Sequence, residues 1–188
     1  VATTQQEINA VRIPAGEADL FIGCDLVVST GDEAMGKVAH GRTHALVNDH
    51  QQPTADFIRD PDAHFPAASM RERISLEVGD HLEFVHATDI ALQLTGNAIG
   101  TNLFLLGLAW QRGWVPVSRQ ALDRAIELNA VAVDFNKRAF LLGRRYAHQP
   151  EVVKSMLPNQ TDTTDLVLCL NELIEDRARR LTAYQSAR

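Results

Sequence analysis

The chain is poor in cysteine, with only Cys24 and Cys169 among its 188 residues. Two cysteines this far apart form neither a disulfide framework nor a CxxC metal or redox motif. A four-cysteine iron–sulfur site within this chain is excluded as well. We therefore expect both side chains to be buried thiols in a reducing compartment, which predicts a cytoplasmic protein.

Long hydrophobic runs are also missing. The most apolar stretch, Ala98 to Trp110, is 13 residues long and is interrupted by Asn102. A membrane-spanning helix needs about 20 apolar residues, so we expect no contact with a membrane. The segment from Val1 to Glu7 has neither a basic region nor an apolar core, and we expect no secretory signal.

Positive charge is in the minority. The chain has 18 Lys and Arg against 24 Asp and Glu, which gives a net charge of -6, and no basic stripe runs through its middle. These features argue against nucleic acid as a partner. Hydrophobic residues make up 45% of the sequence, which is typical of a globular protein and exceeds what a disordered chain contains.

Three short apolar runs predict buried strands: residues 18–23, 44–48 and 82–85. Segments with helical spacing separate them, at residues 30–38 and 70–78, and the stretch 51–66 carries three prolines and reads as irregular. Alternation of strand and helix predicts an α/β fold with a doubly wound parallel sheet.

After Ala87 the pattern is helical. The spacing predicts helices over 89–94, 99–112, 119–129 and 133–145, with Ser118 as the N-cap of the third. We place an α/β domain at residues 1–150 and an amphipathic helical extension at 151–188. In that extension Asp162 would cap a helix whose apolar stripe runs from Leu166 to Tyr184.

Three strands alone make a poor sheet, because their edges and faces need cover. Either a weaker strand lies near Asn9 to Ile13, or part of the fold belongs to a segment outside this chain. Both readings, together with the amphipathic tail, predict a surface that contacts a partner, with self-association as an alternative.

Spacing yields no complete catalytic site. His40 and His44 are separated by Gly41 and do not share a helical face, so we expect no metal site there. Asp56, Asp60 and Asp62 lack the glycine and glutamate of a calcium loop. Glycine-rich nucleotide loops, a nucleophile elbow and a thiamine diphosphate motif are also missing from the sequence.

One set of three polar residues is not easily explained as part of the solvent-exposed surface. Asn97, Thr101 and Asn102 border or enter the most apolar helix. A buried amide without partners costs about 1–3 kcal/mol. The residues either cap this helix and tie it to the sheet, or line a ligand or subunit contact at the carboxyl edge of the strands. We treat all three as weak cofactor-binding candidates and name no catalytic or metal-ligating residue.

Two blocks of the sequence resemble a known family. The first contains ADLFIGCDLVV at residues 18–28, GDEA at 31–34 and PTADF at 53–57. The second contains GNAIGTN at 96–102, FLLG at 104–107, Pro116 and RAIELN at 124–129. Over about residues 10–148 the chain resembles the gamma domain of the 2-oxoacid:ferredoxin oxidoreductases, and most closely that of the fused indolepyruvate ferredoxin oxidoreductases. Leu181 to Gln185 resembles the start of the helical region that follows it.

This resemblance implies a Rossmann-like three-layer fold with a parallel sheet, followed by a mostly helical C-terminal segment. It implies a role in the oxidative decarboxylation of an aryl 2-oxoacid to an acyl-CoA. Thiamine diphosphate, magnesium and iron–sulfur clusters would lie in other domains or subunits, and ferredoxin and coenzyme A would meet the whole enzyme. The family's glycine-rich first loop and its thiamine and cluster motifs have no counterpart here, so we expect the chain alone to be inactive. The first alternative is a stand-alone binding or scaffold protein. The second is a small self-sufficient enzyme that uses Asn97, Asn102 and a nearby acidic residue.

Overall fold

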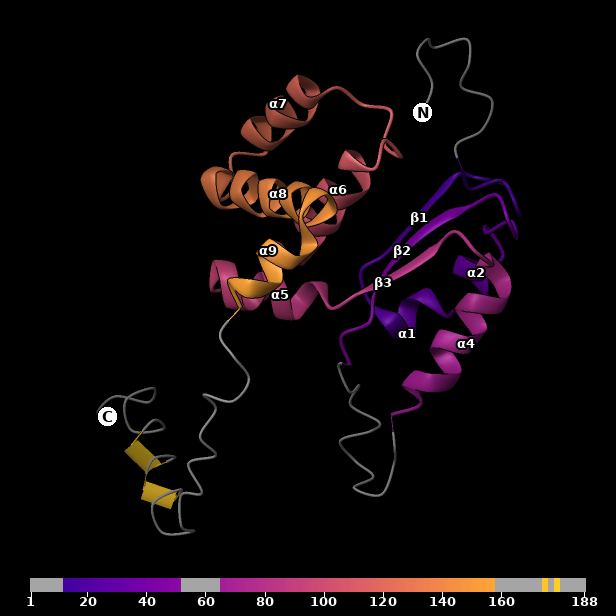
Figure 1. Cartoon of the computed structure of the whole chain (residues 1–188), viewed down its shortest axis with the longest axis horizontal. Coiled ribbons are helices and arrows are strands. Elements are labelled where there is room, and N and C mark those ends of the chain that lie inside the picture. Colours follow the sequence, from indigo (N-terminus) through magenta and orange to yellow (C-terminus); the bar gives the residue numbers. More distant parts are fainter. Residues whose placement is uncertain (1–11, 52–64, 158–173, 176–177, 180–188) are drawn as a thin grey trace, which may run out of the picture. The chain divides into compact units, whose positions relative to one another are not determined.

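The structure is a computed structural model that describes residues 12–51, 65–157, 174–175 and 178–179. The chain divides into two compact units, Val1–Leu157 and Pro158–Arg188 (Figure 1). In the second unit residues 174–175 and 178–179 are helical. The predicted tail helix over 162–184 falls mostly outside the described residues, and so does most of the weak strand proposed near Asn9.

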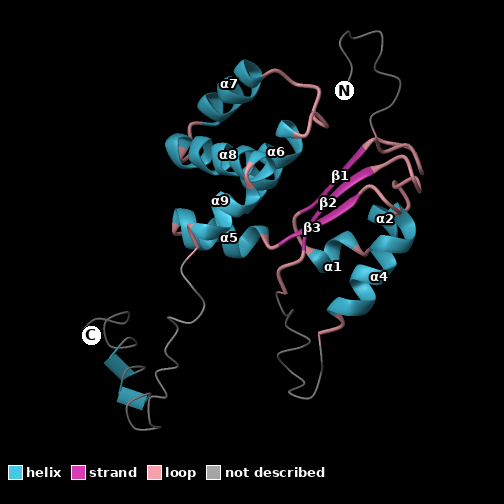
Figure 2. Ribbon diagram, viewed as in Figure 1, coloured by secondary structure: helices cyan, strands magenta, loops and turns pink. Residues whose placement is uncertain are grey.

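A parallel sheet forms the first half of unit one (Figure 2). Its strands are β1 (Leu20–Gly23), β2 (His44–Asn48) and β3 (Leu82–Val85), in the order β1-β2-β3. Leu20 pairs with His44 and Ala45 with Leu82. The three predicted strands are therefore confirmed, and the fold is α/β.

Helices α1 (Leu26–Ser29), α2 (Asp32–Met35) and α4 (Ala67–Val78) connect the strands. The predicted helix at 30–38 was wrong in its bounds. The chain makes a turn of helix directly after β1, since Asp25 caps α1 by accepting a hydrogen bond from the Val28 N–H, and Gly31 then separates it from α2.

The second half is helical, as predicted. It comprises α5 (Ala87–Thr95), the 3₁₀ turn η2 (Ala98–Gly100), α6 (Thr101–Gln111), α7 (Arg119–Asn129), α8 (Val133–His148) and α9 (Pro150–Ser155). Ser118 caps α7, accepting a hydrogen bond from Ala121 N at 3.2 Å, which confirms the predicted cap. The sequence patterns did not indicate α9, which begins with Pro150 at its first turn.

Helices lie on both sides of the sheet (Figure 1), and the central strand β2 packs against a hydrophobic cluster on each face. Leu46 of β2 packs into a cluster with Phe104, Leu105 and Leu108 of α6. Its neighbours Ala45 and Val47 pack on the other face against Ile74 and Val78 of α4, with Leu26 and Met35. This alternation leaves the ends of the strands, rather than a face of the sheet, as the place where polar side chains gather.

Candidate functional site

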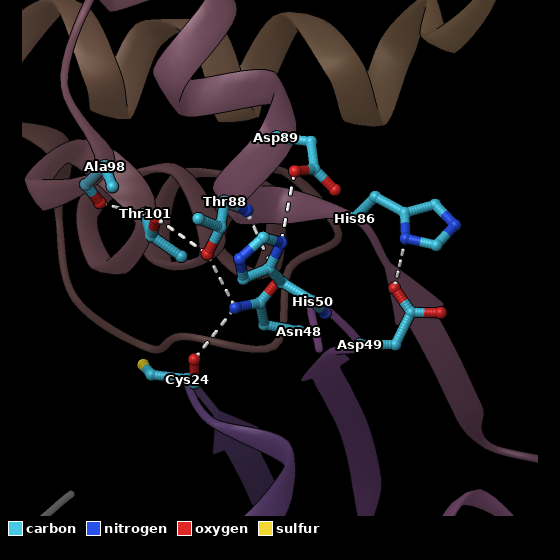
Figure 3. A network of polar contacts seen from close by, with 9 residues as sticks. All are labelled: Cys24, Asn48, Asp49, His50, His86, Thr88, Asp89, Ala98 and Thr101. Atoms are coloured by element: carbon cyan, nitrogen blue, oxygen red, sulfur yellow. Dashed lines mark hydrogen bonds and ion pairs between the residues drawn. The ribbon is translucent and has the colours of Figure 1, made fainter. Parts of the chain in front are cut away.

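The carboxyl ends of all three strands lie at one edge of the sheet, because the strands are parallel. The residues that follow them are Cys24 after β1, Asp49 after β2 and His86 after β3. Open α/β sheets bind ligands at this edge. Figure 3 shows the polar side chains that gather there.

Asn48, the last residue of β2, is buried and holds this edge together. Its Nδ2 donates to the carbonyl oxygen of Cys24 at 2.9 Å and to the Thr88 hydroxyl at 2.8 Å. Its Oδ1 accepts from Thr88 N at 3.3 Å and from His50 N at 3.4 Å. One amide thus joins the end of β1 to the first turn of α5 and satisfies its own buried polar atoms.

The network continues into the apolar helix α6 through Thr101. The hydroxyl oxygens of Thr88 and Thr101 lie 3.3 Å apart, and the Thr101 hydroxyl donates to the carbonyl oxygen of Ala98 at 2.6 Å. Thr101 is 5% exposed. Of the three residues that the sequence singled out, Thr101 is the one that the structure brings into the buried network.

The other two residues lie apart from it. Asn97 is exposed and caps η2, with its Oδ1 accepting a hydrogen bond from Ile99 N at 2.9 Å. Asn97 therefore has the capping role that the sequence offered as one alternative, but it caps the turn that leads into α6. Asn102 is exposed in the first turn of α6.

Asp49 is a buried carboxylate between two basic side chains. Only 3% of its side chain is exposed, and Arg71 Nη1 of α4 lies 3.1 Å from Oδ2. His86 Nδ1 lies 2.7 Å from Oδ1, although this approach lacks the alignment of a hydrogen bond. The second contact is an ion pair when His86 carries a positive charge, because the attraction between opposite charges depends on their separation and not on hydrogen-bond angle. Burial of the carboxylate is tolerated because both oxygens face a basic group.

A second histidine–carboxylate pair lies beside the first. His50 Nδ1 is 3.1 Å from Asp89 Oδ1, and both side chains are partly exposed. In Figure 3 each imidazole turns Nδ1 toward its carboxylate. The His86 side chain is exposed, so the opposite edge of its ring is accessible at the sheet edge.

Cys24 corrects the expectation that both cysteines are buried. It is a free thiol on an exposed residue, because it lies beyond the end of β1 rather than within the strand. Desolvation by neighbouring atoms raises the pKa of its thiol, and the negative charge of Asp25 adds to this. The raised pKa reduces the thiolate fraction at neutral pH, which disfavours a nucleophilic role. Cys169 lies outside the described residues.

Sequence reasoning missed Asn48, Asp49, His50, His86 and Thr88. The available signal was the run of polar residues that begins where the second apolar strand ends, since parallel strands bring such residues to one edge. Among the residues that the structure describes, no group of three or more His, Cys, Asp or Glu side chains is placed to hold a metal ion. In that same part of the chain, no helix has the length and apolarity needed to cross a membrane.

Comparisons with protein-family models, with curated proteins and with solved structures gave no match to this chain.

Proposed function

We propose that this chain is part of the gamma-type domain of a 2-oxoacid:ferredoxin oxidoreductase of the indolepyruvate kind. Its finer fold would then be a Rossmann-like three-layer unit in which helices cover both faces of a parallel sheet. The parent enzyme would oxidatively decarboxylate an aryl 2-oxoacid to an acyl-CoA and pass the electrons to ferredoxin. The chain itself would position other parts of that enzyme rather than carry out the chemistry.

One observation supports this proposal above the others. The first of the two sequence blocks that carry the resemblance ends at residue 57 and the second begins at residue 96, yet both contribute to the buried network at the sheet edge. The first block supplies the Cys24 carbonyl that accepts from Asn48. The second supplies Thr101, whose hydroxyl meets that of Thr88. A functional edge explains why recognisable residues lie at both ends of one network.

In this proposal, all cofactors of the parent enzyme are bound by its other domains. Thiamine diphosphate, magnesium and iron–sulfur clusters supply carbanion stabilisation and electron transfer when bound there. This chain contributes a fixed edge: Asn48 orients the strand ends, and Asp49 with Arg71 and His86 presents charged groups beside it. Such groups suit a contact with a polar neighbouring domain or an anionic substrate.

The test is an assay of the parent protein that contains this sequence. The cofactor-loaded enzyme is supplied with indolepyruvate, coenzyme A and a ferredoxin surrogate, and reduction of the surrogate is followed by absorbance. We expect reduction that requires both indolepyruvate and coenzyme A, and none from the isolated chain. If the cofactor-loaded parent fails to reduce the surrogate with every aryl 2-oxoacid supplied, the proposal is overturned.

A further inference from the structure

Helix α8 carries arginines that the rest of the described chain leaves without an acidic partner. Five of the eight arginines in residues 65–157 form ion pairs with carboxylates, and the three that do not all lie on α8. The three are Arg138, Arg144 and Arg145. In a chain with a net charge of -6, acidic side chains are abundant, so three unpaired arginines on one helix form a local positive surface.

Two of these arginines border a hollow of about 380 Å³ between α6 and α8. Its lining consists of Gln111 from α6 and of Leu141, Arg144, Arg145 and His148 from α8. Arg144, Arg145 and His148 follow Leu141 by three, four and seven residues, so all four lie on one side of α8. The hollow is within the size range of small-molecule sites, which is about 300–1,000 Å³.

Arg144 is held in place before any ligand arrives. Its Nε donates to Gln111 Oε1 at 2.9 Å, and its guanidinium lies over the Trp110 ring at 4.8 Å from the ring centre. These contacts use one N–H and one face of the guanidinium, and leave its terminal amino groups for another acceptor. A fixed, planar fork of this kind matches the oxygens of a phosphate group, and little side-chain entropy is then lost on binding.

The end of a helix provides a simpler reason for cations, and it accounts for part of the set. Arg145 and His148 lie in the last turn of α8, where positive charge complements the helix dipole. That reason does not extend to Arg144, which is turned away toward Trp110 and Gln111 on α6. Nor does it produce a concave lining with an amide and two guanidinium groups.

We propose that this hollow binds a phosphate-bearing small ligand, with Arg144 and Arg145 as the main phosphate contacts. Gln111 holds Arg144 in position, and His148 adds a further polar group at the rim. The exposed side of Leu141 gives an apolar surface on which the rest of the ligand rests. The proposal does not depend on the function proposed above.

The test is a titration of the ¹⁵N-labelled full chain with inorganic phosphate at constant ionic strength. We expect saturable shifts of the Arg144 Nε–H resonance and of backbone amides near His148. Arg145→Gln should weaken phosphate binding roughly tenfold, because it removes one charge-assisted contact. Arg145→Lys keeps the positive charge but loses the planar guanidinium group. Its phosphate affinity should therefore lie between those of the unaltered chain and Arg145→Gln.

Arg138→Gln is the matched control. Arg138 is an exposed arginine on the same helix, but it borders a different hollow with Leu94, Thr95 and Leu142. Its replacement should change phosphate affinity by about twofold at most, since only long-range attraction is lost. Equal weakening by Arg138→Gln and Arg145→Gln would mean diffuse attraction to a positive helix and would overturn the site. Acetate binding as tight as phosphate, or shifts that do not saturate, would also overturn it.

Discussion

Asn48 and Thr88 exchange two hydrogen bonds although they are 40 residues apart in the sequence. The Asn48 amide donates to the Thr88 hydroxyl at 2.8 Å, and Thr88 N donates back to Asn48 Oδ1 at 3.3 Å. The pair fixes the start of α5 against the end of β2. Together with the His50–Asp89 ion pair, it joins the sheet to the helical half of the unit at the candidate site.

Replacing this amide should cost stability. Asn48→Ala leaves the Cys24 carbonyl and Thr88 N without their buried partner, and we expect it to lower the free energy of unfolding by about 1–3 kcal/mol. Urea denaturation followed by circular dichroism measures the loss. Asn129→Ala, an exposed asparagine at the end of α7, is the control and should stay within about 0.5 kcal/mol of the unaltered chain. Equal stability of the two variants would show that the network adds nothing.

The crossing of α6 and α8 depends on two glycines. A Cβ at Gly107 would overlap the carbonyl oxygen of Phe140, and one at Gly143 would overlap that of Phe104. Because backbone lies on both sides, neither helix can yield locally. Gly107→Ala and Gly143→Ala should each lower the unfolding free energy by about 1–3 kcal/mol or more.

Gly31→Ala is the control for these two variants. Gly31 has φ -63° and ψ 148°, and its added Cβ would lie 3.2 Å from the nearest atom, the Val28 carbonyl oxygen. It should therefore be tolerated far better than the helix variants. Thermal unfolding of the three proteins makes the comparison, and a similar loss in all of them would contradict the close approach of α6 and α8.

The turn between α7 and α8 holds two alanines in the left-handed region, Ala130 at φ 54° and Ala132 at φ 45°. This conformation costs a residue with a Cβ about 1–2 kcal/mol, and glycine adopts it freely. After allowance for the larger backbone entropy of glycine, Ala130→Gly should raise stability by up to about 1 kcal/mol. Ala125→Gly, on the exposed side of α7, should lower it by about 1 kcal/mol. Opposite signs are the expected result, and destabilisation by both changes would contradict the strained turn.

The ion pair between Glu127 and Lys137 predicts a pH effect. The hydrogen bond and charge of Lys137 hold the pKa of Glu127 below its usual value of 4.5. A lowered carboxyl pKa in the folded state stabilises the fold above the pKa of the unfolded chain. This contribution is lost as the pH falls through the folded pKa. Carbon-13 titration of the Glu127 carboxyl should give a midpoint below 4.5 that rises toward it in Lys137→Gln. An unchanged midpoint would contradict the pair.

Cys24 should react slowly with iodoacetamide at neutral pH, because desolvation and Asp25 raise the pKa of its thiol above the usual value of 9.0. The rate is measured against pH in a Cys169→Ser background, so that a single thiol reports. Asp25→Asn removes the second cause and should move the inflection to lower pH. An inflection below 9.0 in the Cys169→Ser protein would contradict the stated environment.

The sequence predicted the sheet well and the site only in part. Buried strands such as His44–Asn48 are continuous apolar runs, so period and punctuation identify them with their bounds. Thr101 was singled out because a polar residue inside an apolar helix needs a partner. Its partner Thr88 could not be found the same way, since the contact depends on how α5 and α6 pack.

The positive surface on α8 shows the same limit. Arg138, Arg144 and Arg145 can be read in the sequence, but their lack of acidic partners depends on which carboxylates the fold brings near. Lys137, the neighbour of Arg138 in sequence, is paired with Glu127. The composition and the order of charges along the sequence could therefore not separate unpaired arginines from paired ones. The sequence has no basic stripe, so it also did not predict the hollow beside α8.

In the proposed oxidoreductase, the sheet edge around Asn48 would be needed for turnover. The direct measurement is the rate at which the cofactor-loaded parent reduces a ferredoxin surrogate with indolepyruvate and coenzyme A, below the unfolding temperature of every variant. We expect turnover in the unaltered enzyme and in Asn129→Ala, and a large loss in Asn48→Ala. No turnover in the unaltered enzyme with any aryl 2-oxoacid would contradict the assignment, and full activity in Asn48→Ala would contradict the role of the edge.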